Sequence, residues 1–571
     1  MSDATPLDAL IVGAGPTGLT LAGALLRRGL RVRLVDSALA STSFSKAIGI
    51  QSRTMETFDL LGLADAFVAA GLPLNRASFA SAGHEIGQVS FASLDSRYPY
   101  ILTLPQSDTE EILGAWVTRL GGQIERGVTL ETFTQRDAST PDGHSNQARI
   151  VATLRQADGA SEQVEAAWLI GCDGAHSRVR HLVGATFHGA AYPGTYALAD
   201  VRLDWKRPPD RARIFFHPDG LLAAFPLPGD RYRLIMDTAR TSHGSHDSND
   251  SANAASELSH PPAPTFDEVA AIVARRTEDA EARLSDPHWL ASFRISARSV
   301  DHTRCGRIFL VGDAAHIHSP AGGQGMNTGI QDALNLGWKL ALVQRGLAHD
   351  ALLDSYEGER QPIAEAVIRE TDALLRAATL RNPLMRFGRD SAFSLFTALP
   401  MVERRLVRQI AEVTITYRHS PLTQPGPALA RGSHPGDFAP EVDGLLTPAG
   451  ESTRLAALLR GGASLLLTCA PQGGPTREQT RELAAAIQPW GDALIGYRVA
   501  ASLTVTSAAD ASHALPTLAD PKGALRRAFG IGDDASALIL IRPDGYLALH
   551  AEGARSIEAL RAYTTRALES V

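Results

Sequence analysis

The stretch LDALIVGAGPTGLTLAGALLRRGLRVRLVD, residues 7–36, decides the fold class of this chain. Leu7 to Val12 form a short apolar strand, Gly13 to Gly18 a glycine-rich turn, and Leu19 to Arg28 a helix pattern. A second strand runs from Arg31 to Asp36. A strand, a helix and a strand within about 30 residues have the length of a right-handed parallel crossover. We therefore predict an α/β fold that opens with a doubly wound, Rossmann-like sheet.

The turn in this stretch has the G-x-G-x-x-G spacing of a dinucleotide site. Gly13 makes the tight turn, Gly15 lets a pyrophosphate approach the backbone, and Gly18 lets the helix and strand pack closely. The helix N-terminus offers N–H groups and partial positive charge to the phosphates. Asp36 is placed to bind ribose hydroxyls and would repel a 2′-phosphate, which favours FAD or NAD over NADP and leaves that choice open. The predicted contacts are Gly13, Gly15, Pro16, Thr17, Gly18, Asp36 and Ser37.

Size and composition set further bounds. The chain has 571 residues, enough for about three or four domains. Its net charge of −7 gives no electrostatic reason to bind nucleic acid or anionic lipid. Three widely spaced cysteines, Cys172, Cys305 and Cys469, argue against disulfides and a Cys-rich zinc site and favour a reducing, cytoplasmic location. The first apolar run is short and follows no basic segment, so neither export nor stable membrane association is expected.

The rest of the chain divides by pattern. Alternating strands in residues 79–103 and 197–236 indicate a mostly antiparallel β domain, and RIFLVGDAAH at residues 307–316 returns to a buried parallel strand. The nucleotide-binding domain is therefore expected to be discontinuous. The predicted domains are residues 1–78, 104–185 and 296–375 for nucleotide binding, 79–103 and 186–295 for a substrate-binding β domain with a mobile insertion at 242–264, 376–430 for a helical connection, and 431–571 for a C-terminal α/β domain.

Two later segments carry a family resemblance. GCDGAHSRVR, residues 171–180, and RIFLVGDAAHIHSPAGGQGMNTGIQDALNLGWKL, residues 307–340, resemble motifs of the class A, single-component flavoprotein monooxygenases of the para-hydroxybenzoate hydroxylase type. The resemblance covers roughly residues 7–375, and the C-terminal part resembles the thioredoxin-like domain of phenol hydroxylase and aromatic polyketide hydroxylases.

This resemblance implies that the nucleotide is FAD and that the activity is an NAD(P)H-consuming monooxygenase. NADPH or NADH is implied as a transient donor, since only one complete dinucleotide fingerprint is present. Enzymes of this family use NAD(P)H to reduce FAD. The reduced flavin reacts with O2 to form a C4a-hydroperoxide, whose distal oxygen is transferred to an aromatic ring. The substrate class implied is an aromatic (phenolic) or an aromatic-polyketide or antibiotic-like small molecule.

The resemblance also assigns residues near the flavin. Asp313, after Gly312, is implied to bind the ribityl chain, and its place after a buried strand suggests that it is buried and needs a polyol partner. A helix beginning near Met326 is implied to point its N-terminus at the flavin pyrimidine, where it would stabilise the reduced anion. Lys46 stands where the family more often has Arg, which weakens that contact. The implied cofactor residues are Lys46, Arg53, Gln106, Asp173, Gly174, Gly312, Asp313, Pro320, Gly322, Gly325, Met326 and Asn327.

The sequence assigns fewer residues to the substrate site than to the cofactor site. No catalytic nucleophile and no metal are assigned, because the flavin carries the oxygen chemistry and the flavin motif explains the His-x-His pair at His316 and His318. Alternation along residues 211–217 places successive side chains on opposite faces of a strand, one of which is expected to meet solvent. Candidate pocket residues are Arg213, Phe225, Met236 and Pro320, although ordinary core packing explains Phe225 and Met236 as well.

Alternative functions stay open at this point. The same flavin chemistry supports Baeyer-Villiger insertion or epoxidation, whereas a halogenase is disfavoured because its Trp-x-Trp-x-Ile-Pro signature is absent. A non-catalytic flavoprotein that sequesters a ligand is a hypothesis of a different class. The C-terminal domain lacks a Cys-x-x-Cys pair, so it is expected to serve structure or dimer contacts rather than redox exchange. The chain is expected to be a monomer or a homodimer.

Overall fold

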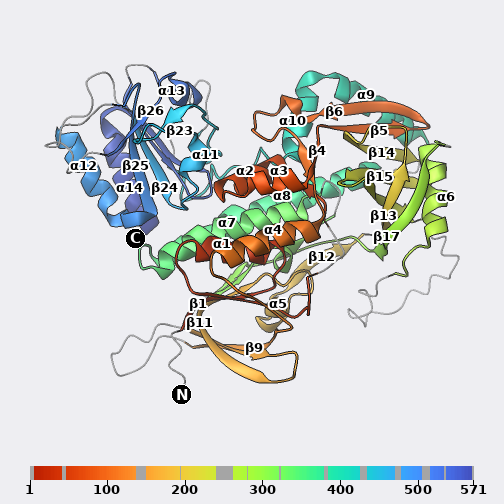
Figure 1. Ribbon diagram of the computed structural model, residues 1–571, viewed down its shortest axis with the longest axis horizontal. Helices are drawn as coiled ribbons and strands as arrows, with labels where there is room; N and C mark the ends of the chain where they lie inside the picture. Colours follow the sequence, from red (N-terminus) through yellow and green to blue (C-terminus); the bar gives the residue numbers. More distant parts are fainter. Residues whose placement is uncertain are drawn as a thin grey trace.

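The structure is a computed structural model, in which three sheet-based bodies surround a central layer of long helices (Figure 1). It describes residues 6–41, 47–136, 149–192, 194–238, 261–279, 281–319, 323–378, 383–424, 434–469, 477–503, 515–532 and 535–568. The expected mobile insertion at residues 242–264 lies almost wholly outside the described residues.

The first body contains an eight-stranded sheet in which β1 (Leu7–Val12) lies between β2 (Val32–Asp36) and β11 (Ser161–Gly171), and both pairs are parallel. β20 (Ile308–Leu310) continues the parallel order beyond β11. The remaining strands are β8 (Ile124–Arg126), β9 (Thr129–Arg136), β10 (Arg149–Arg155) and β19 (Arg304–Cys305). This confirms the predicted doubly wound α/β fold and shows that β20, distant in sequence, completes the first sheet.

Helices cover this sheet because alternate strand residues serve opposite faces. Ala9 and Ile11 of β1 pack in the cluster that contains the central helices, whereas Leu10 and Val12 pack with the β9–β10 ribbon. The helices are α1 (Pro16–Leu26), α2 (Ser52–Leu60), α3 (Ala64–Ala70), α4 (Gln106–Arg119), α5 (Arg178–Leu182), α7 (Gly325–Gln344) and α8 (Asp354–Ala378). A small sheet joins β3 (Gly49–Ile50), β7 (Ile101–Thr103) and β4 (Leu72–Leu74).

Helix α7 is the centre of the molecule. Nearly all of its length is buried, from Asn327 to Leu342, because α1, α2, α8 and the C-terminal domain all pack against it. A helix buried all round normally has apolar residues on every side. Here several of the buried positions are polar or charged, among them Asp332, Asn335 and Lys339.

The second body is a seven-stranded sheet in the order β17–β13–β16–β15–β14–β5–β6, antiparallel except between β14 and β5. Its strands are β5 (Arg76–Ser81), β6 (His84–Ser90), β13 (Thr195–Asp204), β14 (Arg211–His217), β15 (Gly220–Leu227), β16 (Arg231–Thr238) and β17 (Arg283–Phe293). β14, β15 and β16 form the meander that the sequence predicted. β12 (Phe187–Ala191), β18 (Ser296–Val300) and β21 (His316–Ile317) form a separate three-stranded sheet.

Both faces of β14 are covered, so the expectation that one face meets solvent is wrong. Phe215 packs in a cluster with Val269 of α6 (Phe266–Thr277), and Ala212 packs in another with Val407 of α10 (Pro400–Ile410). Helix α9 (Pro383–Ala398) adds Phe393 against Phe79 of β5. The covering helices α9 and α10 come from more than 150 residues further along the chain, which local alternation could not reveal.

The third body is the C-terminal domain, which occupies the opposite end of the molecule from the β domain (Figure 1). Its strands are β22 (Leu445–Leu446), β23 (Ser452–Thr453), β24 (Ser464–Cys469), β25 (Leu494–Ala500), β26 (Thr517–Ala519), β27 (Ala537–Ile541) and β28 (Leu547–Glu552). Its helices are α11 (Leu455–Leu458), α12 (Arg477–Ile487), α13 (Ala524–Ala528) and α14 (Ser556–Leu568). The order β28–β27–β24–β25, with β27 antiparallel to both neighbours, is thioredoxin-like.

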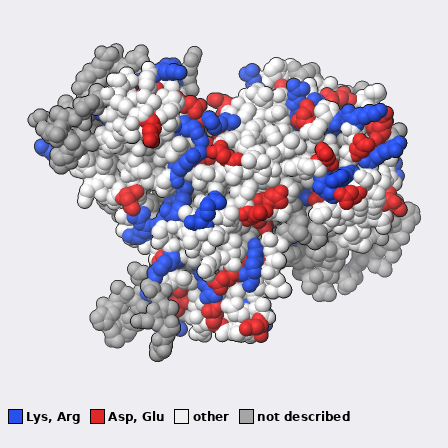
Figure 2. All heavy atoms as spheres, viewed as in Figure 1, with Lys and Arg blue, Asp and Glu red and all other residues white. Residues whose placement is uncertain are grey.

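Basic and acidic side chains are interspersed over the face in view, in keeping with the modest net charge (Figure 2). Among the helices in the described ranges, none combines the length and apolar character needed to cross a membrane.

Candidate functional site

Four polar or glycine positions follow four parallel strands at one edge of the first sheet. Val12 pairs with Val35 and Gly171, and Gly171 pairs with Leu310, so these strands end in register. Gly13 follows Val12 and Asp36 follows Val35, while Asp173 and the pair Gly312 and Asp313 lie two or three residues beyond Gly171 and Leu310. Because the carboxyl ends of parallel strands are where open α/β sheets bind ligands, this edge is the candidate site.

The glycine-rich turn has the geometry that its spacing predicts. Gly13 has φ +104°, and a Cβ there would lie 2.3 Å from the carbonyl oxygen of Cys172. A Cβ on Gly18 would lie 1.9 Å from the carbonyl oxygen of Gly13. A Cβ on Gly15 would meet nothing within 4 Å, so the space beside that residue is open. Gly13 and Gly18 therefore serve the fold, and Gly15 faces room for a ligand.

Helix α1 starts directly at this open space. Gly15 is its N-cap and no side chain caps the first turn, which begins with Pro16. The N–H groups of the first turn are thus available to an anion, and the helix dipole favours one. Thr17, in the same turn, packs against Gly312 and Gly329, because Cβ atoms on those glycines would lie 2.8 and 2.4 Å from its hydroxyl oxygen. The glycines allow α1, the Gly312 turn and α7 to meet.

Asp36 is held at the end of β2 by the backbone. Its carboxylate accepts hydrogen bonds from the N–H of Ala14 at 2.6 Å and of Ala38 at 2.8 Å. Arg126 lies 3.5 Å away on β8. The neighbouring Ser37 is exposed. This fixes the carboxylate beside the glycine-rich turn, where the sequence predicts that it meets ribose hydroxyls.

Asp173 organises the second loop of the site. It accepts hydrogen bonds from the Ser177 hydroxyl at 2.5 Å and the Val179 N–H at 3.1 Å, while Gly174 takes φ +77° with open space around it. Arg180 donates to the carbonyls of Ala175 at 2.7 Å and Ala314 at 3.0 Å. The loop after β11 is thereby tied to the turn after β20.

Asp313 is exposed, so the expectation that it is buried at a strand end is wrong. β20 ends at Leu310, and Gly312 then adopts φ +61°, which turns the chain out of the core before Asp313. The carboxylate therefore needs no partner within the protein. Its exposure at the ligand edge leaves it free to accept hydrogen bonds from a polyol, the role that the resemblance implies.

The N-terminus of α7 lies next to Asp313. A Cβ on Gly325, the first residue of α7, would lie 3.9 Å from the Asp313 carboxylate, and no described side chain caps this end. Asn327 is buried and donates from Nδ2 to the carbonyls of Gly49 and Gly323 at 2.9 and 2.7 Å, while it accepts from the N–H of Gln51 at 2.9 Å. Asn327 thus fixes the helix end to the small sheet.

Two further predicted cofactor residues, Met326 and Gln106, lie on the central helices. Met326 is half-buried and packs on the central cluster. Gln106 begins α4, where it accepts from the N–H of Ala47 at 3.2 Å and donates to Glu110 at 2.9 Å. Lys46, Pro320 and Gly322 lie outside the described residues.

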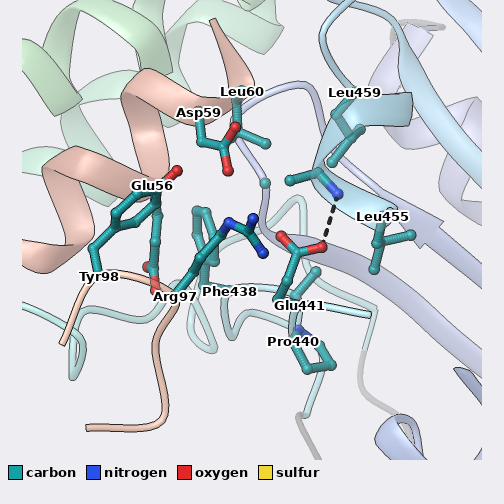
Figure 3. Close-up of a pocket in the computed structure, with 13 residues that line it drawn as sticks. Glu56, Asp59, Leu60, Arg97, Tyr98, Phe438, Pro440, Glu441, Leu455 and Leu459 are labelled. Atoms are coloured by element: carbon teal, nitrogen blue, oxygen red, sulfur yellow. Dashed lines mark hydrogen bonds between the residues drawn. The ribbon is translucent and has the colours of Figure 1, made fainter. Parts of the chain in front are cut away.

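Arg53 lies where α2 meets the C-terminal domain, a boundary that we call the domain seam. Its guanidinium stacks over the ring of Phe438 at 3.9 Å, pairs with Glu56 and donates to the Val413 carbonyl at 3.2 Å. The carboxylates of Glu56, Asp59 and Glu441 and the ring of Phe438 line a small cavity there, between α2 and the C-terminal domain (Figure 3). Its volume of about 30 Å³ and its three acids make it unsuitable for a dinucleotide. These contacts hold the Arg53 guanidinium against Phe438, Glu56 and Val413.

The structure separates the predicted substrate residues. Met236 is fully buried in the cluster that packs on α6, and Arg213 lies on the same face, where it donates to the Pro208 carbonyl at 3.0 Å. Phe225 lies on the opposite face, against the cluster that contains Val407. These residues therefore cannot line one pocket, and Met236 serves the core. Of the three candidates that the structure describes, only Phe225 faces the side of the sheet next to β4 and β7.

His318, which the sequence pattern raised only as a possible metal ligand, has an unpaired acceptor nitrogen in the described part of the chain. Its Nδ1 lies 3.0 Å from the carbonyl oxygen of Ser319, so Nδ1 carries the proton, and Nε2 has no hydrogen-bond partner in the described part of the chain. Burial lowers its pKa, so the ring is neutral. Nε2 would lie 3.7 Å from a Cβ on Gly325. A lone acceptor beside the α7 N-terminus is a candidate ligand contact.

Asp332 was not among the predicted site residues. Completely buried in α7, it accepts from the Gly312 N–H at 3.3 Å and pairs with His316 at 2.8 Å and Arg360 at 2.5 Å. Burial alone would raise the pKa of Asp332, but its interactions with Arg360 and His316 outweigh desolvation and hold that pKa below the usual range. The signal in the sequence is the set of polar and charged residues, Asp332 among them, that interrupts the apolar positions of GIQDALNLGWKL.

These groups fit FAD. The open space at Gly15 and the free first turn of α1 suit a diphosphate, Asp36 suits the adenosine ribose, and exposed Asp313 suits the ribityl chain. The open N-terminus of α7 beside Asp313 suits the pyrimidine end of a flavin, on which negative charge develops during reduction.

Comparisons with known proteins agree with this site. A family model described as "FAD binding domain" matches residues 6–371. The chain is 37% identical to 6-methylpretetramide 4-monooxygenase of Streptomyces rimosus, over 96% of this chain and 91% of that protein. The solved structure of OxyS anhydrotetracycline hydroxylase from the same species superimposes with TM-score 0.74 at 29% identity, over 99% of this chain and all of that one.

A second structural relative was solved with its ligands. It is the ternary complex of aklavinone-11 hydroxylase with FAD and aklavinone, with TM-score 0.72 and 25% identity over the full length of both chains. The chain described here belongs to the FAD binding domain family and is an FAD-dependent monooxygenase.

Proposed function

We propose that this enzyme hydroxylates a fused-ring aromatic substrate of the polyketide type, with NADPH or NADH as electron donor. The observation that supports the substrate class is the match over nearly the whole chain to a monooxygenase named for 6-methylpretetramide. In the balanced reaction, one atom of O2 enters the substrate as a hydroxyl group, the other becomes water, and NAD(P)H supplies two electrons. When bound, FAD supplies the redox chemistry that joins these reactants.

The protein's own residues bind and orient the cofactor. We assign the diphosphate to the Gly13–Gly18 turn and α1, the adenosine ribose to Asp36, and the ribityl chain to Asp313. His318 is assigned as a hydrogen-bond acceptor, since its Nε2 needs a donor. The N-terminus of α7 is assigned to the pyrimidine ring, where it favours the anionic reduced form and so assists electron uptake.

The substrate is assigned to the face of the β domain that carries Phe225. That face lies next to β4 and β7, whose Thr103 hydroxyl donates to the Pro226 carbonyl at 2.7 Å. Cover by α10 on the same face would keep water from the reacting ring. An aromatic side chain there suits a flat, largely apolar substrate.

The test is a substrate screen with purified holoenzyme. NADPH and NADH oxidation would be followed with phenols, hydroxylated benzoates, quinolones, rifamycins, tetracyclines and other fused-ring polyketides, and products would be identified by mass spectrometry. We expect fused-ring compounds to stimulate oxidation and to gain one oxygen atom. Turnover of simple phenols alone would refute the substrate class, and ring expansion by an inserted oxygen would refute hydroxylation.

A further inference from the structure

The C-terminal domain contributes charged groups to the buried interior of the FAD-binding domain. Arg542 follows β27, and only 1% of its side chain is exposed. It donates to the carboxylate of Glu359 on α8 at 2.6 and 2.9 Å, and to that of Asp544 at 3.0 and 2.5 Å. One guanidinium thus joins two acids, with one on each side of the domain boundary.

The two acids in turn hold α7. Glu359 accepts from Lys339 and Asn335, both at 2.7 Å, and Asp544 accepts from the indole N–H of Trp338 at 3.1 Å. All three donors are buried on the same side of α7. The middle of the helix is therefore anchored directly by Asp544 of the C-terminal domain and, through Glu359 of α8, by Arg542.

A second branch leads toward the flavin edge. The Arg542 guanidinium lies 4.9 Å from the centre of the Tyr417 ring, and the Tyr417 hydroxyl accepts from Arg360 at 3.0 Å. Arg360 holds Asp332 at 2.5 Å and donates to the Thr328 carbonyl at 3.2 Å, near the start of α7. Asp332 then accepts from the N–H of Gly312 at 3.3 Å. This N–H belongs to the residue that precedes Asp313.

The charges in this network balance. Asp332, Glu359 and Asp544 oppose Lys339, Arg360 and Arg542, three against three, and each is at most 4% exposed. A balanced, hydrogen-bonded network can persist in the interior, but removing one member leaves a buried charge unpaired. Burying these charges costs desolvation energy that apolar side chains in the same place would not cost. A benefit that can offset this cost is that the network fixes the packed helices and turns in one arrangement.

We infer that Arg542 of the C-terminal domain is a positioning residue of the flavin site. Through Glu359 and Asp544 it fixes the middle of α7, and through Tyr417, Arg360 and Asp332 it fixes the start of that helix and the Gly312–Asp313 turn. The C-terminal domain is on this account a part of the FAD-binding scaffold. The inference depends on FAD binding only and does not depend on the proposed substrate.

The test measures FAD affinity in full-length variants. Arg542→Lys keeps the charge but loses the two-pronged contact, and Tyr417→Phe removes only the acceptor for Arg360. The full chain, stripped of flavin, would be titrated with FAD and followed by flavin fluorescence. We expect the FAD Kd to rise about three- to thirtyfold in both variants, with a shifted absorption band of the bound flavin.

A matched control sits elsewhere on the same domain seam. Arg454 of the C-terminal domain pairs with Asp59 of α2, and neither residue contacts Asp332 or α7 in the described hydrogen-bond network. Arg454→Lys should lower the melting temperature of the apoprotein as Arg542→Lys does, but leave the FAD Kd within about twofold of wild type.

Two results would overturn the inference. An unchanged FAD Kd and flavin spectrum in both Arg542→Lys and Tyr417→Phe would show that the network serves stability alone. An equal rise of the Kd in Arg454→Lys would show that any loosening of the seam weakens FAD binding. The isosteric Tyr417→Phe keeps the test valid if Arg542→Lys fails to fold.

Discussion

The carboxylate of Asp36 accepts a hydrogen bond from the backbone N–H of Ala14 at 2.6 Å. The acid that ends β2 therefore fixes the glycine-rich turn that follows β1, before any ligand is bound. Because the turn, Asp36 and the start of α1 are held together, little ordering is required when FAD binds, and preorganisation of this kind favours affinity.

Gly15→Val is expected to give folded apoprotein. The structure shows open space around Gly15, so the new side chain fits the protein but occupies the path of the diphosphate. We expect the FAD Kd to rise at least about a hundredfold, or about 2.8 kcal/mol. FAD titration and the melting temperature of the apoprotein together check this result.

Gly13→Ala provides the contrast at the same turn. Its Cβ would clash with the Cys172 carbonyl at 2.3 Å, and its φ of +104° disfavours any side chain. We expect a loss of about 1–3 kcal/mol of stability, measured by denaturant unfolding of the apoprotein. If Gly13→Ala were as stable as wild type and Gly15→Val unfolded, the assignment of these two glycines would be reversed.

Asp313→Ala is expected to weaken FAD binding without affecting the fold. The side chain is exposed, so its removal leaves no buried group unpaired. Loss of a charged hydrogen bond to the ribityl chain should cost about 1.5–3 kcal/mol of binding free energy. An FAD titration at constant apoprotein melting temperature checks this, and undiminished FAD retention would rule out the ribityl assignment.

His318→Phe is expected to raise the FAD Kd by about tenfold, because an aromatic ring is kept but the Nε2 acceptor is lost. Since burial lowers the His318 pKa, the imidazole is already neutral at pH 7. The FAD Kd of the wild type should therefore change little through this titration between about pH 6.5 and pH 8. A wild-type Kd that weakens steeply on raising the pH through 7 would contradict a neutral acceptor at this position.

Glu412 predicts a pH effect on stability. Burial raises its pKa to about 8, above the ordinary 4.5, although its hydrogen bond from Gln331 at 2.5 Å opposes the rise. The folded chain then holds a proton that the unfolded chain releases, so stability falls as the pH rises from about 4.5 toward 8. Glu412→Gln keeps the contact but removes the charge.

The melting temperature of Glu412→Gln should therefore decline less than that of the wild type over this pH range, with the largest difference at its upper end. The comparison of the two pH profiles is the measurement. Parallel profiles would mean that Glu412 is ionised in the folded protein at neutral pH.

The parts of the site that lie within one local motif could be predicted from sequence. The Gly13–Gly18 turn and the place of Asp36 follow from spacing on a strand, a helix and a strand, and the structure reproduces that unit. Asp313 was expected to be buried because it follows an apolar strand, but the positive φ of Gly312 turns it outward. A single backbone dihedral angle decides such a side chain's direction, and sequence spacing does not encode it.

Contacts between residues far apart in the sequence could not be predicted from local sequence patterns. The contact of Arg53 with Phe438 and the link from Arg542 to Glu359 depend on how the C-terminal domain packs on α2, α7 and α8. Met236 and Phe225 look alike in an alternating pattern, but only the packing of α6 and α10 shows that they occupy opposite faces. The charged residues Asp332 and Lys339 of α7 were a usable hint, since a helix buried on all sides normally carries apolar side chains.

We propose that this chain transfers oxygen from O2 to an organic substrate with FAD bound at the Gly13, Asp36 and Asp313 edge. The most direct measurement supplies purified holoenzyme with NAD(P)H, a compound that stimulates its oxidation, and O2 labelled with heavy oxygen. We expect a hydroxylated product that carries one labelled atom from O2, and no labelled atom when the label is in the water. A product without label, or hydrogen peroxide formed in place of product with every compound screened, would contradict it.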